Sequence, residues 1–69
     1  MKRKTETLSP RETEVLLLLI EGLDPQEIAD RLKCSTATVR THIRHIHTKL
    51  KVHTNAKAIA WGHKEGLQK

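Results

Sequence analysis

The sequence predicts an all-α fold made of four short helices. Aliphatic residues recur at helical spacing, capping residues mark the helix starts, and Trp61 is the one aromatic residue among 69. The apolar residues are mostly Leu, Ile, Val and Ala, and this composition, with so few aromatic residues, favours helices over strands. A chain of this length makes one small domain, since it buries only about 60% of the surface that its unfolded form exposes.

The first two helices are predicted from matching start signals. Ser9 to Glu12 forms a capping box with proline at the first helical position, and this helix should run to about residue 21 and stop at Gly22. Asp24 to Glu27 repeats the pattern, and the second helix should end near Lys33. Residues 1–7 are polar and unpatterned, so we expect a flexible lead or the remnant of a linker.

The third and fourth helices follow from an apolar stripe and from a second set of caps. Ser35 can cap a helix of about residues 36–50, and Thr54 can cap one of about residues 55–66. Four apolar residues recur along one side of the third helix and should be buried: Val39, Ile43, Ile46 and Leu50. The predicted domain therefore covers residues 8–67.

The gap between the second and third helices is short enough to define their geometry. Only Lys33, Cys34 and Ser35 separate them, so the two helices must cross steeply, as in a helix-turn-helix of about residues 25–44. Lys33 would cost about 1 kcal/mol there if its backbone is left-handed. The Cys34 side chain is expected to point toward the core and to pack there as a small apolar group.

Positive charge is concentrated in the second half of the chain. Residues 1–30 hold seven acidic and four basic residues, whereas residues 31–64 hold eight basic residues and no acidic one. All five histidines lie in that second stretch. A long segment without carboxylates is typical of a protein that binds a polyanion, because each Lys or Arg at a phosphate releases counterions.

The polar side of the third helix is suited to a DNA duplex. Arg44 lies near its centre among small groups and hydrogen-bond donors, with Arg40 on one flank and Lys49 on the other. Arginine can donate two hydrogen bonds to guanine O6 and N7, threonine can contact a thymine methyl group, and lysine can bind the DNA backbone. The free amides at Thr36 and Ala37 add a site for a phosphate.

Other functions find less support in the sequence. His42, His45 and His47 suggest a metal site, but His47 lies on a different side of the helix from the other two, and no Cys or carboxylate completes a set of ligands.

The sequence also argues against a disulfide framework and a membrane span. A single cysteine excludes an internal disulfide, and Val15–Ile20 is too short to span a bilayer. Neither a catalytic triad nor a phosphate loop indicates an enzyme. We expect a soluble cytoplasmic protein without cofactor or metal.

Seven segments of the chain carry a specific combination of residues: Leu8–Leu16, Glu21–Leu23, Glu27–Ala29, Arg31–Leu32, Thr38–Ile43, Lys49–Leu50 and Ala58–Glu65. Together they resemble DNA-binding domains of the LuxR/GerE type, and the last segment is most similar to the output domains of NarL-type response regulators. The resemblance covers about residues 8–67 and departs from the common pattern at Lys51, where many members have glycine, and at Asn55, where arginine is frequent.

The resemblance implies a four-helix fold that binds double-stranded DNA as a bacterial transcription regulator. It implies base contacts by Arg40, Thr41 and Arg44, and backbone contacts around Thr36, Thr38 and Lys49. Dimerisation commonly uses the fourth helix, whose pattern leaves Ala56, Ala60 and His63 for a weak symmetric contact on paired half-sites. Three further positions are predicted as backbone contacts: Gln26, His45 and Thr48.

Two questions of context stay open at this point. The chain is either a fragment that has lost a receiver or ligand-binding domain, or a complete small regulator, and RNA polymerase is a further candidate partner. A helical adaptor or antitoxin-like module that binds protein is the alternative function. The acid-free helix face argues against that alternative, because an ordinary exposed helix mixes Glu with Lys.

Overall fold

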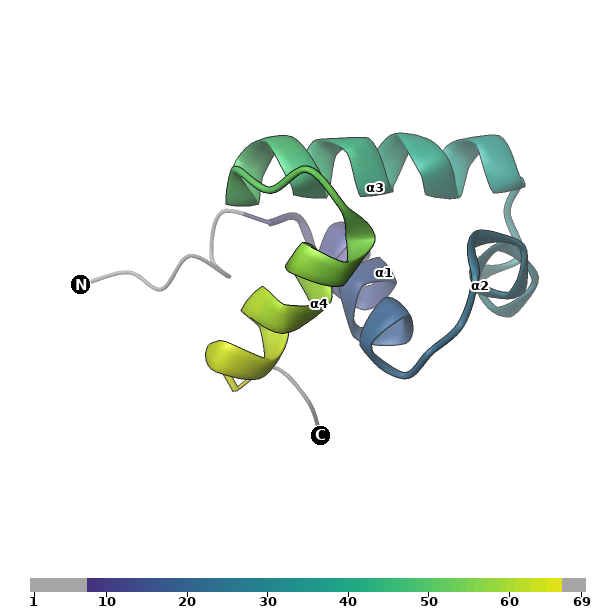
Figure 1. The fold of residues 1–69 in the computed structure, drawn as a ribbon. Coiled ribbons are helices and arrows are strands. Elements are labelled where there is room, and N and C mark those ends of the chain that lie inside the picture. Colours follow the sequence, from purple (N-terminus) through teal and green to yellow (C-terminus); the bar gives the residue numbers. More distant parts are fainter. Residues whose placement is uncertain (1–7, 67–69) are drawn as a thin grey trace.

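The computed structural model describes residues 8–66, which form four helices (Figure 1). These are α1 (Pro10–Ile20), α2 (Pro25–Leu32), α3 (Thr36–Leu50) and α4 (Asn55–Lys64). No β-strand occurs among the described residues, and the predicted all-α class is confirmed. The predicted lead, residues 1–7, and residue 67 lie outside them. In the same range, no helix has the length and apolar character needed to cross a membrane.

Reciprocal side-chain caps start the first two helices. Ser9 Oγ accepts a hydrogen bond from the Glu12 amide at 3.1 Å, and Glu12 Oε1 accepts one from the Ser9 amide at 2.9 Å. Asp24 and Glu27 form the same box at 2.8 and 2.9 Å. Each box satisfies two amides that the first turn of a helix leaves without a partner. Both predicted helix starts are confirmed.

Left-handed residues end the first three helices. Gly22 has a φ of 97°, Lys33 a φ of 58° and Lys51 a φ of 57°. After α2, for example, the Cys34 amide donates to the Ala29 carbonyl at 3.0 Å and closes the helix end. A side chain in this conformation costs roughly 1–2 kcal/mol. The strain considered for Lys33 is therefore present, and Lys51 carries it as well.

The hydrophobic core lies between α3 and the other helices. Leu17 is half-buried on the opposite side of α1 from its core residues. Cys34 packs against the core and is half-buried, which agrees with its predicted inward position. The predicted stripe of α3 is buried throughout, and the largest fully buried side chains are Val15, Leu16, Ile28, Val39 and Ile46.

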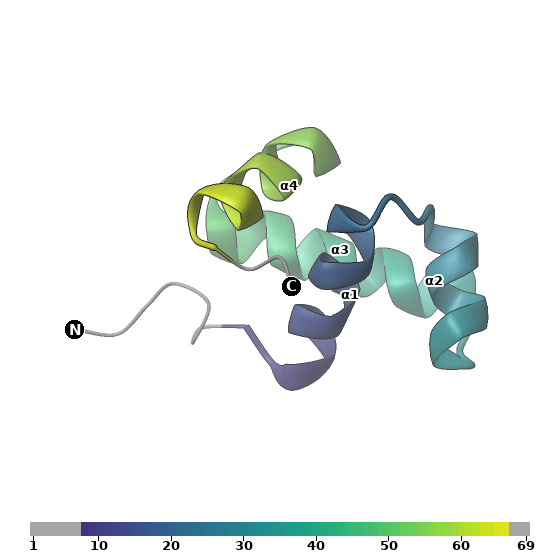
Figure 2. The same cartoon turned by 90° about the horizontal axis from the view of Figure 1, so that it is seen from below.

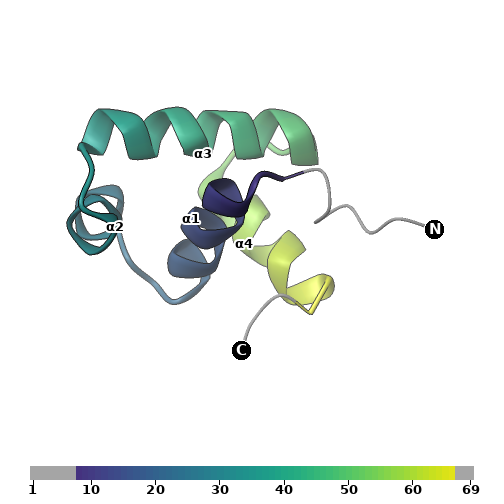
Figure 3. The ribbon, with the colours of Figure 1, turned by 180° about the vertical axis from the view of Figure 1, so that it is seen from behind.

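The arrangement of the helices leaves one side of α3 uncovered. In Figure 1, α3 runs along the top of the molecule, with α1, α2 and α4 below it. The view from behind shows the same arrangement (Figure 3), and the view from below places α1 between α2 and α4 (Figure 2). Residues 33–35 make the turn between α2 and α3, so the predicted helix-turn-helix is present and its second helix is open along its outer side.

Candidate nucleic-acid interface

The uncovered side of α3 carries the residues predicted for DNA contact. None of the fifteen residues of α3 is acidic, and its apolar stripe is turned inward. Thr36 is half-buried in the first turn, and Gln26 is exposed in the first turn of α2. The exposed polar residues on this side, called the α3 face from here on, are Thr38, Arg40, Thr41, Arg44, His45, Thr48 and Lys49.

Two threonines of the α3 face use their hydroxyl hydrogens within the helix. Thr41 Oγ1 donates to the Ala37 carbonyl and Thr48 Oγ1 to the Arg44 carbonyl, both at 3.1 Å. Their methyl groups and oxygen lone pairs remain available to a partner. This geometry suits Thr41 to a thymine methyl or to an amino group at a base edge better than to a phosphate, which offers only acceptors.

A buried acid on α1 holds two other residues of the face. The Glu12 side chain is only 5% exposed, Lys49 Nζ donates to its Oε1 at 2.7 Å, and His45 Nδ1 lies 3.4 Å from its Oε2. Lys49 is therefore not the unattached surface cation that the sequence suggests. Its side chain is still 38% exposed, and an ammonium has three N–H groups, so donors remain for a second partner.

Glu12 is ionised at neutral pH in this setting. Burial by itself raises the pKa of a carboxyl group, because the charged form loses solvation. Hydrogen bonds from Lys49 and Ser9, together with the charge of Lys49, outweigh burial and hold the pKa of Glu12 below its ordinary value of 4.5. The carboxylate thereby fixes the start of α1 against the C-terminal half of α3.

The histidines of α3 are dispersed rather than gathered. His47 Nε2 lies 2.8 Å from Asn55 Oδ1, so this nitrogen donates to the amide oxygen and joins α3 to α4. His42 is half-buried, and its Nδ1 has no hydrogen-bond partner. His45 faces Glu12 instead. Across residues 8–66, no three His, Cys, Asp or Glu side chains are placed to hold a metal ion.

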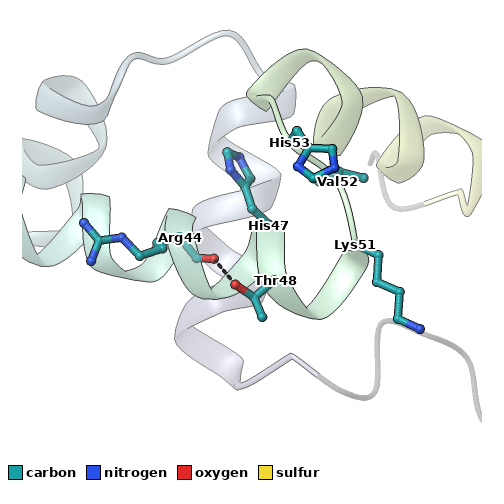
Figure 4. A pocket seen from close by; sticks show the side chains of 6 residues that line it. All are labelled: Arg44, His47, Thr48, Lys51, Val52 and His53. Atoms are coloured by element: carbon teal, nitrogen blue, oxygen red, sulfur yellow. Dashed lines mark hydrogen bonds between the residues drawn. The ribbon is translucent and has the colours of Figure 1, made fainter.

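The structure has a depression beside the α3 face that helical periodicity did not predict (Figure 4). It has a volume of about 470 Å³ at the junction of α3 and α4, and both Lys51 and His53 line it. These two residues lie between the helices, where helical periodicity assigns no face. The glycine common at position 51 in similar domains was the available signal, because it marks a left-handed residue that turns the chain back beside α3.

The exposed and buried sides of α4 match the prediction. Ala58 and Gly62 are buried against the domain. Ala56, Ala60 and His63 are exposed, and their spacing places them on one side of the helix. This side has small residues that permit close approach of a second helix.

The fold and the α3 face define a helix-turn-helix domain of the DNA-binding class, and the sequence identifies its family. The model of the bacterial regulatory proteins of the luxR family matches residues 6–61, and the chain belongs to this family. Helix-turn-helix domains of this family are DNA-binding regulators and not enzymes. The predicted resemblance is confirmed.

Known relatives place the chain among response-regulator domains. It is 36% identical to the nitrate/nitrite response regulator protein NarL of Escherichia coli K12 over 66 residues, which are 96% of this chain and 31% of NarL. It is 39% identical to the transcriptional regulatory protein LiaR of Bacillus subtilis over 62 residues, 90% of this chain and 29% of LiaR. The chain thus spans about a third of the length of these relatives.

A solved structure supports the same assignment. The transcription factor GerE superposes with a TM-score of 0.80 at 34% sequence identity, and the match covers 90% of this chain and 92% of that one. The similarity therefore extends over the whole four-helix arrangement.

Proposed function

We propose that this domain binds double-stranded DNA in a sequence-specific manner, with α3 in the major groove, to regulate bacterial transcription. The observation that supports it best is the α3 face, which is uncovered by other helices and carries arginines and threonines without a single acid. The major groove, about 12 Å wide, admits an α-helix, and each base pair presents a distinct hydrogen-bonding pattern there.

Arg40, Thr41 and Arg44 contact base edges in this proposal. The two arginines are four residues apart and therefore about 6 Å apart along the helix axis. This distance is close to two base-pair steps of about 3.4 Å, so each guanidinium can donate a pair of hydrogen bonds to a different guanine. Thr41, with its hydroxyl hydrogen committed to Ala37, offers its methyl group between them.

Backbone contacts surround these residues in the proposal. Gln26 and Thr36 lie in the first turns of α2 and α3, where free amides and the helix dipole favour a phosphate. Thr38 belongs to the same end of α3. His45 and Lys49 add contacts from the other end, and Lys49 keeps its bond to Glu12 while a second N–H meets a phosphate. Thr48, whose hydroxyl hydrogen is held by the Arg44 carbonyl, contacts a backbone sugar through its methyl group.

Two copies of the domain pair through α4 on adjacent half-sites. Ala56, Ala60 and His63 supply a small, symmetric surface, so the pairing is weak without DNA. In the complete protein we expect a receiver domain to precede or follow this domain, because the response regulators that it resembles are about three times as long. RNA polymerase is the expected partner of the assembled regulator.

Selection of bound sequences from a random DNA pool tests this proposal. We expect a defined half-site, repeated at a spacing that reports the dimer geometry, and an affinity that falls by orders of magnitude from low to physiological salt. Ala60→Glu should reduce binding to paired half-sites but not to a single half-site. An affinity that is flat in salt, with no enriched sequence, would favour the protein-binding alternative.

A further inference from the structure

We propose that a basic segment before α1, made of Lys2, Arg3 and Lys4, binds the minor groove of the DNA that flanks the half-site. This inference rests on the proposed function and extends DNA recognition beyond the α3 face. The segment, called the basic arm, precedes residues 8–66, which the structure describes.

The composition of the basic arm suits a polyanion. Its three cations are consecutive, so no apolar side chain between them can hold the segment against the core. Residues 1–7 contain one acid, Glu6, against these three cations. A basic run that precedes a folded domain is typical of arms that bind nucleic acid.

The described chain begins directly beside a cation of the α3 face. Glu12 Oε1 accepts a hydrogen bond from the Ser9 amide at 2.9 Å and another from Lys49 Nζ at 2.7 Å. Because both nitrogens bind the same oxygen atom, they lie no further apart than the sum of these two distances, 5.6 Å. Leu8, the residue before Ser9, is 7% exposed and belongs to the core. The point where the basic arm enters the domain is therefore fixed next to Lys49.

The views of the fold place this entry point at one end of the α3 face. In Figure 1 the first described residues, drawn in purple, lie close beneath the C-terminal half of α3, and the view from behind shows the same proximity (Figure 3). Lys49 belongs to this half, whereas the turn at residues 33–35 lies at the other end of α3. The basic arm thus approaches the DNA from the end of α3 opposite the turn.

Lys49 lies at the edge of the major groove in the proposed complex. It follows Arg44 by five residues and is therefore about 7.5 Å further along the helix axis. Half of the major groove is about 6 Å wide, so Lys49 meets a sugar-phosphate strand when Arg44 lies over the base edges. The neighbouring minor groove begins on the other side of that strand.

The basic arm is long enough to cross this strand and to enter the minor groove. Lys4 and Lys2 precede Leu8 by four and six residues, which extend over at most about 14 and 21 Å. The minor groove is about 6 Å wide. Its negative potential is strongest where A·T pairs narrow it, and extended arms insert arginine there. Arg3 enters the groove in this arrangement, while Lys2 and Lys4 bind phosphates at its edges.

A triple variant, Lys2→Gln with Arg3→Gln and Lys4→Gln, tests the basic arm. Fluorescence anisotropy should compare its binding with that of the wild type on two duplexes of equal length, in which the selected half-site is flanked by A·T pairs or by G·C pairs. The two duplexes carry the same phosphate charge, but the guanine amino group alters the minor groove of the second.

We expect the triple variant to bind the A·T-flanked duplex at least about tenfold more weakly than the wild type, with a salt slope lower by about 2–3 units. The wild type should prefer the A·T-flanked duplex, and the triple variant should lose this preference. Its Tm should be unchanged, because the substitutions precede the core. Lys64→Gln removes one charge at the C-terminal end of α4 and should change neither the affinity nor the preference.

The outcomes separate this inference from the proposed function. Wild-type protein that binds no duplex would remove the proposed function and the basic arm with it. Wild-type protein that binds DNA, with a triple variant of unchanged affinity and salt slope, would overturn the basic arm alone. Equal losses on the two duplexes would show that the three cations supply only diffuse charge, and would overturn the minor-groove assignment.

Discussion

Replacing Glu12 should destabilise the domain more than replacing an exposed acid that caps no helix. Its carboxylate is 5% exposed, closes the capping box on Ser9 and binds the Lys49 ammonium at 2.7 Å. Glu12→Gln keeps an oxygen for the Ser9 amide but loses the charge that attracts Lys49 and His45. Glu12→Ala loses the cap as well.

The magnitude follows from the partners of the carboxylate. A hydrogen bond to a charged group contributes roughly 1.5–3 kcal/mol, and this value must be reduced because Lys49 is 38% exposed and can return to water. We expect about 1 kcal/mol of lost stability for Glu12→Gln. Loss of the cap adds about 1 kcal/mol, so Glu12→Ala should lose about 2 kcal/mol. Each kcal/mol lowers Tm by about 4–8 °C in a domain of this size.

Urea unfolding at pH 7, followed by circular dichroism, measures these losses. Glu14 provides the matched control, since it lies two residues away and pairs with Arg11 at 3.6 Å with its side chain 55% exposed. Glu14→Gln and Glu14→Ala should change the free energy of unfolding by no more than about 0.5 kcal/mol. If the Glu12 variants behave like the Glu14 variants, the buried ion pair does not fix α1 against α3.

The same carboxylate makes stability depend on pH in a defined window. The pKa of Glu12 is below 4.5 in the folded state and near that ordinary value in the unfolded chain. The unfolded state then binds more protons as the pH falls, so the contribution of Glu12 is complete above about pH 4.5 and is lost below it, as the pH passes through the folded pKa. The stability difference between wild type and Glu12→Gln should therefore shrink on acidification; a difference that grows would contradict the lowered pKa.

Two further predictions concern packing and backbone strain. Leu16→Ala should cost about 2–5 kcal/mol because Leu16 is fully buried, whereas Leu17→Ala should cost under about 1 kcal/mol; equal losses in urea unfolding would contradict the register of α1. Lys33→Gly should stabilise the domain by about 0.5–1 kcal/mol, because glycine relieves the left-handed strain at a small cost in unfolded-state entropy. A lower Tm for this variant would show that the Lys33 side chain makes contacts that offset the strain.

Local signals in the sequence were sufficient for the helices and for the α3 face. The capping boxes at Ser9 and Asp24 are complete within four residues, so they can be recognised without knowledge of the fold. The apolar stripe of α3 fixes which side is buried and, by difference, which side is free. The short turn at Lys33 then defines how α2 and α3 are joined.

Contacts between distant residues could not be predicted in the same way. Glu12 and Lys49 are 37 residues apart, and their meeting depends on where α1 crosses α3. The bond from His47 to Asn55 likewise requires the left-handed turn at Lys51, which periodicity does not indicate. For this reason the sequence patterns predict neither the ion pair of Lys49 with Glu12 nor the depression at the α3–α4 junction.

The role of Arg44 provides the most direct test of sequence-specific DNA binding through α3. Fluorescence anisotropy should compare wild type, Arg44→Ala and Arg11→Ala on the selected duplex and on a scrambled duplex of equal composition at physiological salt. Arg11 is the control because it carries the same charge on α1, where it pairs with Glu14. Arg44→Ala should lose about 1–3 kcal/mol on the selected duplex and much less on the scrambled one, while Arg11→Ala should lose little on either. Equal losses for Arg44→Ala on the two duplexes would show that Arg44 supplies charge without reading bases, and would contradict the proposed role of the α3 face.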